Sequence, residues 1–260
     1  MTKERQLEKN EAIKNWCSKL QEDEADIKVD ENFIETKMRF SIESLSEYDL
    51  IELIIMASKY NLKDVLKKLI KSVKMKREYA TNALPIAVRE SNVEIVKLLI
   101  SVGADVKAYE NLAIRDAVEQ GNIEIAKMLI LAGADVTASY NNAILVASKN
   151  GNKEMVELLT EAGADVASNN NAPIFMALLQ GYIEIVNFLM KNGADITEQK
   201  SEALKIACSR GYEEIVEILI AANADVAESD NYNLKIANKK GYKEIVKMLI
   251  AAGADESVIL

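Results

Sequence analysis

Histidine is absent from the sequence of 260 residues, and this absence excludes several kinds of chemistry. Histidine is the commonest general base in enzymes and the usual partner of a nucleophilic serine or cysteine. It is also a common zinc ligand, and two cysteines far apart in the sequence cannot complete a structural zinc site by themselves. We therefore predict no catalytic residues, no metal site and no cofactor, and hence a protein that is not an enzyme. An enzymatic alternative would have to use Asp, Glu, Lys, Tyr or Cys17.

Proline, cysteine and aromatic residues are scarce. The two prolines are Pro85 and Pro173, and aromatic residues make up 5% of the chain. Few prolines together with many Ala, Leu, Ile, Lys and Glu residues favour helices. The apolar share of 49% is too high for a disordered tail. Because Cys17 and Cys208 are the only cysteines, a disulfide framework is not expected and a reducing interior fits best.

The sequence has neither a long apolar run nor an excess of basic residues. Its net charge is −9 and its pI is about 4.9, whereas proteins that bind nucleic acid or anionic membranes usually present a basic face. No apolar run reaches the ~18 residues of a membrane-spanning helix, and residues 1–17 lack the apolar centre of a signal peptide. We expect an intracellular, cytoplasmic protein with no nucleic-acid, membrane or small-molecule partner.

One sequence motif, which we call the phrase, recurs along most of the chain. The residues EIVKLLISVGADV at 94–106 return with small changes every thirty residues. Each unit has a shorter first helical pattern, as at 141–151, and a longer second one, as at 153–163. In the second pattern, apolar residues at helical spacing form one stripe. The phrase defines six full units: 77–106, 107–136, 137–166, 167–196, 197–226 and 227–256.

Small residues recur at fixed places in these units. Glycine is favoured after a helix because the following residue often takes a left-handed conformation, and Asn223 and Ser91 replace glycine at two such places. A column of alanines in the first helix indicates that two helices approach closely. The columns are Gly121, Gly151, Gly181, Gly211 and Gly241; Gly103, Gly133, Gly163, Gly193 and Gly253; and Ala87, Ala117, Ala147, Ala177, Ala207 and Ala237.

The length of a unit explains why there are several of them. Thirty residues bury too few apolar side chains to offset the conformational entropy that is lost when they become ordered. Neighbouring units must therefore cover each other's apolar stripes. We predict an all-α solenoid of stacked helix-turn-helix units that are joined by short turns.

The pattern resembles the ankyrin repeat. The usual family unit has about 33 residues, opens with T-P-L-H-x-A, has a G-H turn and ends like EIVKLLISVGADV. The second half matches closely in all six units, whereas only APIFMA at 172–177 keeps the family's proline, at Pro173. The three missing residues fall where the family has a protruding β-hairpin, so a short turn is expected there. Repeats of this length look like those of ankyrin proteins from large DNA viruses of protists.

The resemblance implies binding of a protein partner, by a monomer, through the concave face that the family builds from its turns and first helices. On the turns, this face would carry Tyr109, Glu110, Tyr140, Asn169, Asn170, Gln199 and Lys200. On the first helices, it would carry Arg89, Arg115, Glu119, Lys149, Phe175, Leu179 and Lys239. Our hypothesis is that the partner anchors near Tyr140, Phe175 and Leu179, because exposed apolar groups often mark a partner site. The alternative is that Phe175 packs between units.

Two acidic columns have a structural interpretation. The Asp in each GAD motif, such as Asp105 or Asp165, is predicted to hydrogen-bond nearby backbone in a turn. The Glu at the start of each second helix, such as Glu94 or Glu184, suits the positive end of the helix dipole. Cys208 aligns with Val88 and is expected to be a small packed residue.

Residues 46–76 keep the register of the repeats but lack the GAD ending. Ala57 lies thirty residues before Ala87 and Leu69 thirty before Leu99, which predicts a degenerate first repeat that serves as the N-terminal cap. Residues 50–66 also resemble the C-terminal helix pair of the BTB fold and its cullin-adaptor relatives. That resemblance implies a second function, a substrate-binding adaptor of a ubiquitin ligase.

The two ends of the chain are less regular. Residues 1–45 are charged, and we expect them to be partly helical. Residues 257–260 form a C-terminal tail, which is expected to pack on the final helix pair.

Overall fold

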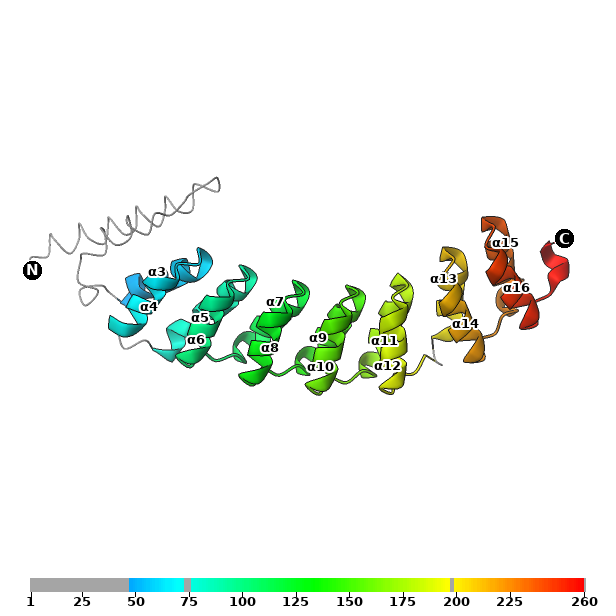
Figure 1. Cartoon of the computed structure of the whole chain (residues 1–260). Coiled ribbons are helices and arrows are strands. Elements are labelled where there is room, and N and C mark those ends of the chain that lie inside the picture. Colours follow the sequence, from blue (N-terminus) through cyan, green and yellow to red (C-terminus); the bar gives the residue numbers. More distant parts are fainter. Residues whose placement is uncertain (1–46, 73–75, 197–198, 260) are drawn as a thin grey trace, which may run out of the picture. The chain divides into compact units, whose positions relative to one another are not determined.

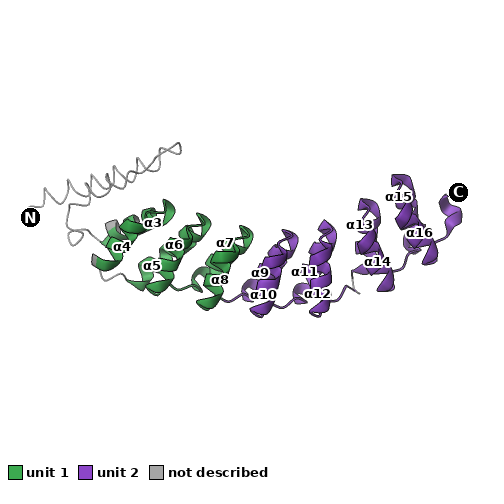
Figure 2. Ribbon diagram, viewed as in Figure 1, with its two compact units in different colours: residues 1–134 green, residues 135–260 purple. Residues whose placement is uncertain are grey.

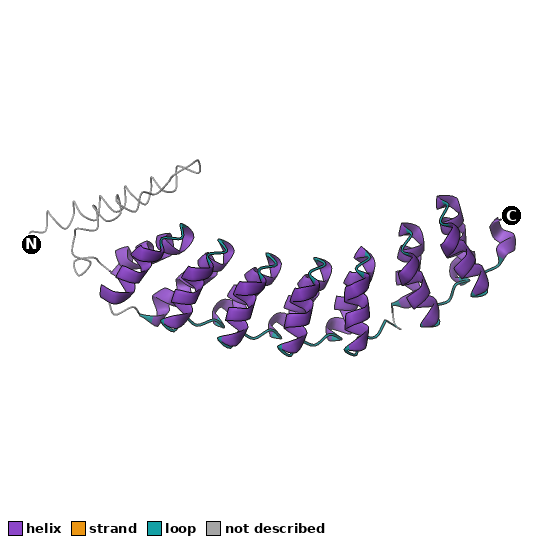
Figure 3. Cartoon of the chain, in the orientation of Figure 1, coloured by secondary structure: helices purple, strands orange, loops and turns teal. Residues whose placement is uncertain are grey.

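The computed structural model describes residues 47–72, 76–196 and 199–259, and all the regular structure within them is helical (Figures 1 and 3). The predicted all-α class is therefore confirmed for the described residues. The segment 1–45, for which we predicted partial helix, lies outside them.

The helices come in pairs, each with a first and a second helix. In the order of the chain, the pairs are α3 (Glu47–Lys59) and α4 (Lys63–Ser72), α5 (Arg77–Arg89) and α6 (Val93–Ser101), α7 (Ala108–Glu119) and α8 (Ile123–Leu131), α9 (Ala138–Lys149) and α10 (Lys153–Glu161), α11 (Ser168–Gln180) and α12 (Ile183–Lys191), α13 (Lys200–Arg210) and α14 (Glu213–Ala221), and α15 (Glu228–Lys240) and α16 (Lys243–Ala251). A short 3-10 helix, η2 (Glu256–Ile259), follows.

The chain divides into two compact units, residues 1–134 and 135–260 (Figure 2). In the first unit, α3, α5 and α7 pack in sequence order, as do α4, α6 and α8. In the second unit, the first helices α9, α11, α13 and α15 pack one against the next, and η2 packs on α15. Within each unit, the helix pairs are thus stacked in the order of the sequence.

The predicted helix lengths need one correction. We expected the first helix of each unit to be the shorter one, but α9 has 12 residues and α10 has nine. The first helix is longer because the turn that opens the unit is continuous with it. The second helix ends before Gly163, where the backbone takes a positive φ of 96°.

The core consists of the repeated apolar columns. On α10, Met155, Val156 and Leu159 are completely buried, whereas Ala162, the last residue of the predicted stripe, is partly exposed at the end of the helix. Every alanine of the first-helix column is at most 1% exposed, as the close approach of neighbouring helices predicts. Burial of these columns against the next pair holds the stack together.

The left-handed positions lie where the sequence predicts them. Asn223 and Ser91, which replace glycine, have φ values of 57° and 53°. Gly151 has a second reason to be glycine, which the sequence alone did not reveal. A Cβ atom built on Gly151 would lie 2.6 Å from Cζ of Tyr182, because the ring of this tyrosine covers the turn of the preceding pair. Tyr212 and Tyr242 lie in the same way over Gly181 and Gly211.

The glutamate column has a further role besides its place in the first helical turn. Glu94 Oε2 lies 2.5 Å from Nζ of Lys63, and Glu184 Oε2 lies 3.1 Å from Nζ of Lys153. Each ion pair joins the second helices of two neighbouring pairs. The hydrogen bond from Lys63 lowers the pKa of Glu94. Both pairs are exposed, so we expect them to add little to the stability.

The pair α3–α4 packs like the others. Ala57 on α3 and Leu69 on α4 are 1% exposed, and these helices pack against α5 and α6. Asn61, between the two helices, has the same left-handed conformation as Ser91, with φ 55°. Asn92 Nδ2 donates a hydrogen bond of 2.7 Å to the carbonyl oxygen of Ser58.

Candidate protein-binding surface

The turn that opens a repeat has a left-handed backbone. In four repeats, three consecutive residues have φ between 52° and 60° and ψ between 29° and 50°. These turns are 109–111, 139–141, 169–171 and 229–231. A left-handed residue that is not glycine costs roughly 1–2 kcal/mol, so other contacts must stabilise the turn. We expected a short turn here, but the sequence did not reveal its handedness.

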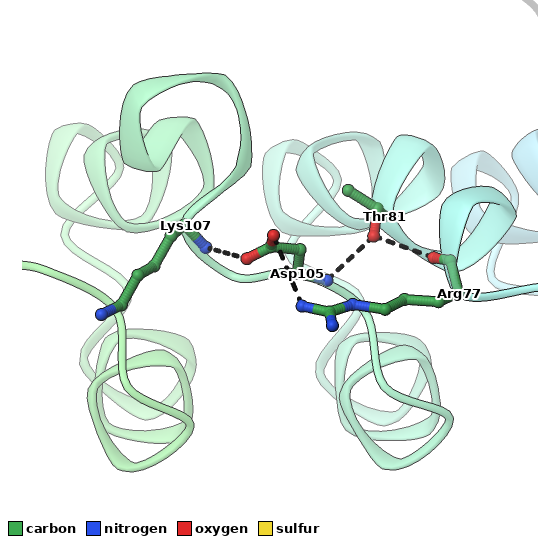
Figure 4. Close-up of polar contacts among 4 residues, drawn as sticks. All are labelled: Arg77, Thr81, Asp105 and Lys107. Carbon is green, nitrogen blue, oxygen red and sulfur yellow. Dashed lines mark hydrogen bonds and ion pairs between the residues drawn. The ribbon is translucent and has the colours of Figure 1, made fainter.

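An asparagine at the third position supplies one such contact. Asn141 Oδ1 accepts a hydrogen bond of 2.9 Å from the backbone N–H of Asp165, which belongs to the same repeat. Asn231 Oδ1 accepts the equivalent bond from Asp255 at 3.0 Å. In the repeat 77–106, Thr81 Oγ1 takes this role and accepts from the N–H of Asp105 at 2.9 Å (Figure 4). The opening turn of a repeat is thereby tied to its GAD ending.

The aspartate of the GAD ending has the structural role that its position predicted. Asp165 Oδ1 accepts a hydrogen bond of 2.9 Å from the N–H of Ala167, two residues on. Asp105 accepts the same bond from Lys107 at 3.1 Å, and its Oδ2 lies 3.4 Å from the guanidinium of Arg77 (Figure 4). Each side chain thus holds the start of the next turn in place.

The repeat 197–226 departs from this pattern. Ser201 occupies the position of the turn asparagine, and Gln199 has a φ of −109°, outside the left-handed region. Lys200 directs its ammonium group to the carbonyl oxygen of Ala222, at 3.5 Å. An open hollow of about 350 Å³ lies between α13 and α15. Its lining consists of Glu202, Lys205, Ile206, Ser209, Ser229 and Tyr232.

This hollow identifies which side of each first helix is accessible. Because the repeat length is constant, the residues thirty positions before or after Glu202, Lys205, Ile206 and Ser209 lie on the same side of their own helices. All of them are at least partly exposed in residues 135–260. We call this side of the second unit the first-helix face. It comprises Asn142, Leu145, Val146 and Lys149 of α9, Ala172, Phe175, Met176 and Leu179 of α11, the four lining residues of α13, and Tyr232, Lys235, Ile236 and Lys239 of α15.

The predicted site residues fall into two groups, one in each unit. The first unit holds Arg89, Tyr109, Glu110, Arg115 and Glu119. The second unit holds Tyr140, Lys149, Asn169, Asn170, Phe175, Leu179, Gln199, Lys200 and Lys239. In the second unit, Tyr140 is 84% exposed at its turn, and the turn residues Asn169 and Asn170 are also exposed. Phe175 and Leu179 are half-buried, so they belong neither to the core nor to the fully exposed surface.

Several predicted binding residues also make contacts within the protein. Arg89 Nε lies 2.9 Å from Oδ2 of Asp116. The hydroxyl group of Tyr109 donates a hydrogen bond to Oδ1 of Asn82. These interactions orient the side chains and join one helix pair to the next.

Side-chain amides link the turns of the second unit in the same way. Asn169 Nδ2 donates a hydrogen bond of 2.8 Å to the carbonyl oxygen of Tyr140. Gln199 Nε2 donates one of 2.7 Å to the carbonyl oxygen of Asn170. The turns thus present a connected polar edge beside the first-helix face.

The sequence analysis missed several apolar residues of the first-helix face, and three large ones lie on α9 and α11. Leu145, Val146 and Met176 are half-buried, like Phe175, and lie on the same side of the adjacent helices α9 and α11. We call Leu145, Val146, Phe175, Met176 and Leu179 the apolar strip. The repeat alignment held the signal, because the positions of Leu145 and Phe175 carry Arg115, Lys205 or Lys235 in other repeats.

The described residues give three observations on metal binding, thiol chemistry and membrane insertion. They include no group of three or more Cys, Asp or Glu side chains that could hold a metal ion. Cys208 is buried as expected, and burial raises the pKa of its thiol to about 12, so the thiol stays protonated near neutral pH. None of the helices in the part of the chain that the structure describes is both long and apolar enough to cross a membrane.

Comparisons with known proteins agree with the stacked helix pairs. A family model described as ankyrin repeats in three copies matches residues 53–140, 138–200 and 197–258. Among solved structures, the chain is similar to the ankyrin repeat domain of Bcl-3, a member of the IkappaB protein family, with a TM-score of 0.58 and 22% identity. The match covers 75% of this chain and 97% of the Bcl-3 chain, and at this identity it shows the fold alone. No curated protein gives a significant match.

Proposed function

The chain belongs to the ankyrin repeat family, and from this premise we propose that it is a non-enzymatic module that binds a protein partner through the first-helix face and its turns. The ankyrin fold is a protein-interaction fold. The observation that carries the proposal is the apolar strip on α9 and α11, together with the exposed ring of Tyr140 on the opening turn of α9. Apolar side chains that adjoin one another on a polar surface favour a protein interface.

Internal packing does not account for Phe175 and Leu179 of the apolar strip. In the six full repeats, the buried residues of the first helices are apolar with few exceptions, because each helix pair must cover its neighbour. The exceptions are Asn111, Ser148, Ser168 and Asn233. By contrast, the position of Phe175 is occupied by arginine or lysine in three other repeats. A charged residue at this position is therefore compatible with the stack. The aromatic ring of Phe175 and the apolar side chain of Leu179 thus support a role in binding rather than in folding.

We also propose that the protein acts inside the cell as a monomer, without nucleic-acid, membrane or small-molecule ligands. Cys208 is a free, buried thiol, which suits a reducing compartment. The net charge of −9 disfavours polyanionic partners.

The alternative function, a ubiquitin-ligase adaptor, depends on the resemblance of residues 50–66 to a BTB-type helix pair. The family match begins at residue 53, within α3, and α3 and α4 pack against α5 and α6 as the other pairs do. These observations favour a capping repeat over a separate recruiting element. Recovery of a cullin or its adaptor with the full chain, lost on changes to exposed α3 residues, would support the alternative.

The test of the proposed function is affinity capture with the full chain. The variant carries Tyr140→Asn, Phe175→Lys and Leu179→Lys, and each new residue already occurs at the equivalent position of another repeat, in Asn170, Lys205 and Lys149. We expect at least a tenfold loss of the captured partner, because interface anchors dominate binding. Thermal unfolding should change little.

A matched control replaces exposed apolar residues of the second helices instead. Leu131 is 88% exposed and Met190 is 39% exposed, and both are changed to Ser. The control should retain the partner. Equal losses in both variants, or full retention in the first variant, would contradict the proposed function.

A further inference from the structure

The first-helix face of the second unit, taken together with the last residues of α13 and α15 and the opening turn of α15, has the opposite charge from the chain as a whole. The chain carries a net charge of −9. This surface, however, carries six basic and three acidic side chains. The basic residues are Lys149, Lys205, Arg210, Lys235, Lys239 and Lys240, and the acidic ones are Glu202, Glu228 and Asp230. The surface is therefore a local basic region on an acidic protein.

Only part of this positive charge is neutralised within the protein. Lys235 Nζ lies 2.6 Å from Oδ2 of Asp230, and Lys205 Nζ lies 4.0 Å from a carboxylate oxygen of Glu228. The remaining lysines, Lys149, Lys239 and Lys240, are exposed and have no carboxylate within 4.0 Å among the residues that the structure describes. These three cations are available to a ligand.

The basic region adjoins the apolar strip. The guanidinium group of Arg210 donates a hydrogen bond to the carbonyl oxygen of Leu179, which belongs to the apolar strip. Helix α11 packs against α13, and α13 packs against α15. Along these three helices, the surface changes from the apolar strip to the hollow beside Tyr232 and then to the lysines of α15. A ligand that matches this order must be apolar in one part and acidic in the other.

We propose that the partner presents an acidic peptide segment with apolar side chains to this face. The inference rests on the proposed function and names the chemistry of the partner. Its apolar side chains cover Phe175 and its neighbours, and its carboxylates face Lys239 and Lys240. Complementary charge speeds association and rejects wrong partners, while the apolar contact supplies most of the affinity.

Nucleic acid fits this surface less well than an acidic peptide. Its phosphates would meet the carboxylates of Glu202 and Asp230 as well as the net negative charge of the chain. A phosphate backbone would also leave the apolar strip uncovered. A peptide segment can place a neutral or apolar side chain where the surface is not basic.

The test is a selection of random peptides of about 12 residues on the immobilised full chain, followed by fluorescence anisotropy with the enriched peptides. We expect enriched sequences with a net negative charge and at least two large apolar residues. Their affinity should fall as the salt concentration rises, because added salt screens exposed charges. Enrichment of neutral or basic peptides would overturn the proposal.

Two variants locate the binding. The charge variant carries Lys149→Glu, Lys239→Glu and Lys240→Glu, and Glu119 and Glu90 occur at the equivalent positions of other repeats. We expect it to bind the enriched peptides at least tenfold more weakly. The matched control changes three exposed lysines of second helices, Lys97, Lys191 and Lys243, to Glu, and it should bind as the unmodified chain does. Equal losses in the two variants would overturn the proposal.

The outcome separates this inference from the proposed function. A natural partner that is lost in the Phe175 variant but retained in the charge variant would leave the proposed function standing and overturn the acidic segment. The chain itself contains six carboxylates in residues 22–31. Peptide binding that appears only after these six are changed to amides would also overturn the proposal, because the occupant would then be the chain's own segment.

Discussion

The side-chain oxygen of Asn171 accepts a hydrogen bond of 2.7 Å from the backbone N–H of Asp195, which lies 24 residues later in the same repeat. Asn171 is also the third left-handed residue of its turn, with φ 60°. One side chain therefore combines two properties, since asparagine tolerates the left-handed region and its amide can accept a backbone hydrogen bond. This combination explains how a 30-residue repeat ends and restarts without a β-hairpin.

Replacement of Asn171 separates these two properties. Asn171→Ala removes the hydrogen bond and places a less tolerant residue at positive φ, so we expect a loss of about 2 kcal/mol in unfolding free energy. Asn171→Gly removes only the hydrogen bond and should lose about 1 kcal/mol. Urea denaturation measures both values. Asn150→Ala, at an exposed residue with negative φ, is the control and should change little. Identical curves for all three variants would contradict this account of the turn.

Much of the stack follows from the sequence, but the handedness of the turn and the exposure of the first-helix face do not. The apolar and alanine columns predict buried helix pairs, because burial must repeat wherever the neighbour repeats. The left-handed turn depends on a contact between residues 24 positions apart, such as Asn171 and Asp195, which local preference does not specify. Similarly, Met176 appears in the sequence as one more apolar residue of a helix. Its exposure depends on how α9 and α13 lie against α11.

Asn233 is buried where other repeats have small apolar residues. It is 0% exposed, and its side-chain nitrogen and oxygen have no hydrogen-bond partner among the described residues. The equivalent positions hold Ala83, Ala113, Ala143, Pro173 and Ala203. A buried polar group without a partner costs roughly 1–3 kcal/mol.

Asn233→Ala should therefore stabilise the protein by about 1–2 kcal/mol. The midpoint of thermal unfolding should rise by about 2–4 °C for each kcal/mol. Differential scanning calorimetry checks the change, with Asn238→Ala at an exposed position of the same helix as the control. A lower midpoint for Asn233→Ala than for the unmodified chain would show that the Asn233 amide stabilises the folded protein, contrary to this prediction.

Gly151 and Gly241 have similar backbone conformations, but only Gly151 is covered by a tyrosine ring, so alanine should cost more stability at Gly151. Gly151 and Gly241 have φ values of 75° and 77°, so Ala at either position carries a similar conformational cost of roughly 1 kcal/mol. A Cβ on Gly151 would also lie 2.6 Å from the ring of Tyr182, whereas nothing lies within 4 Å of a Cβ on Gly241. We expect Gly151→Ala to lose about 1 kcal/mol more than Gly241→Ala.

A second substitution tests whether Tyr182 causes the difference. Asn122 and Asn152 occupy the position of Tyr182 in other repeats, so Tyr182→Asn is compatible with the stack. In the Tyr182→Asn background, the cost of Gly151→Ala should fall to that of Gly241→Ala. Chemical denaturation of the four variants gives this coupling. If the cost of Gly151→Ala were the same with and without Tyr182, the tyrosine ring could not be the cause of the difference between the two glycines.

Cys208 links stability to alkaline pH. Burial raises the pKa of its thiol from 9.0 to about 12 in the folded protein, while the unfolded chain keeps the ordinary value. Between these two pH values the unfolded state releases a proton that the folded state retains. The contribution of this thiol to stability is therefore fully present below pH 9 and is lost as the pH rises from 9 towards 12.

The substitution Cys208→Val tests this account, and valine already occurs at the equivalent positions Val88 and Val118. It should remove this part of the pH dependence. The measurement is the difference in unfolding free energy between the two proteins at pH 8 and at pH 10.5. A constant difference over this range, or rapid labelling of Cys208 in the folded protein by a thiol reagent at pH 8, would show that the thiol is not held in its neutral form.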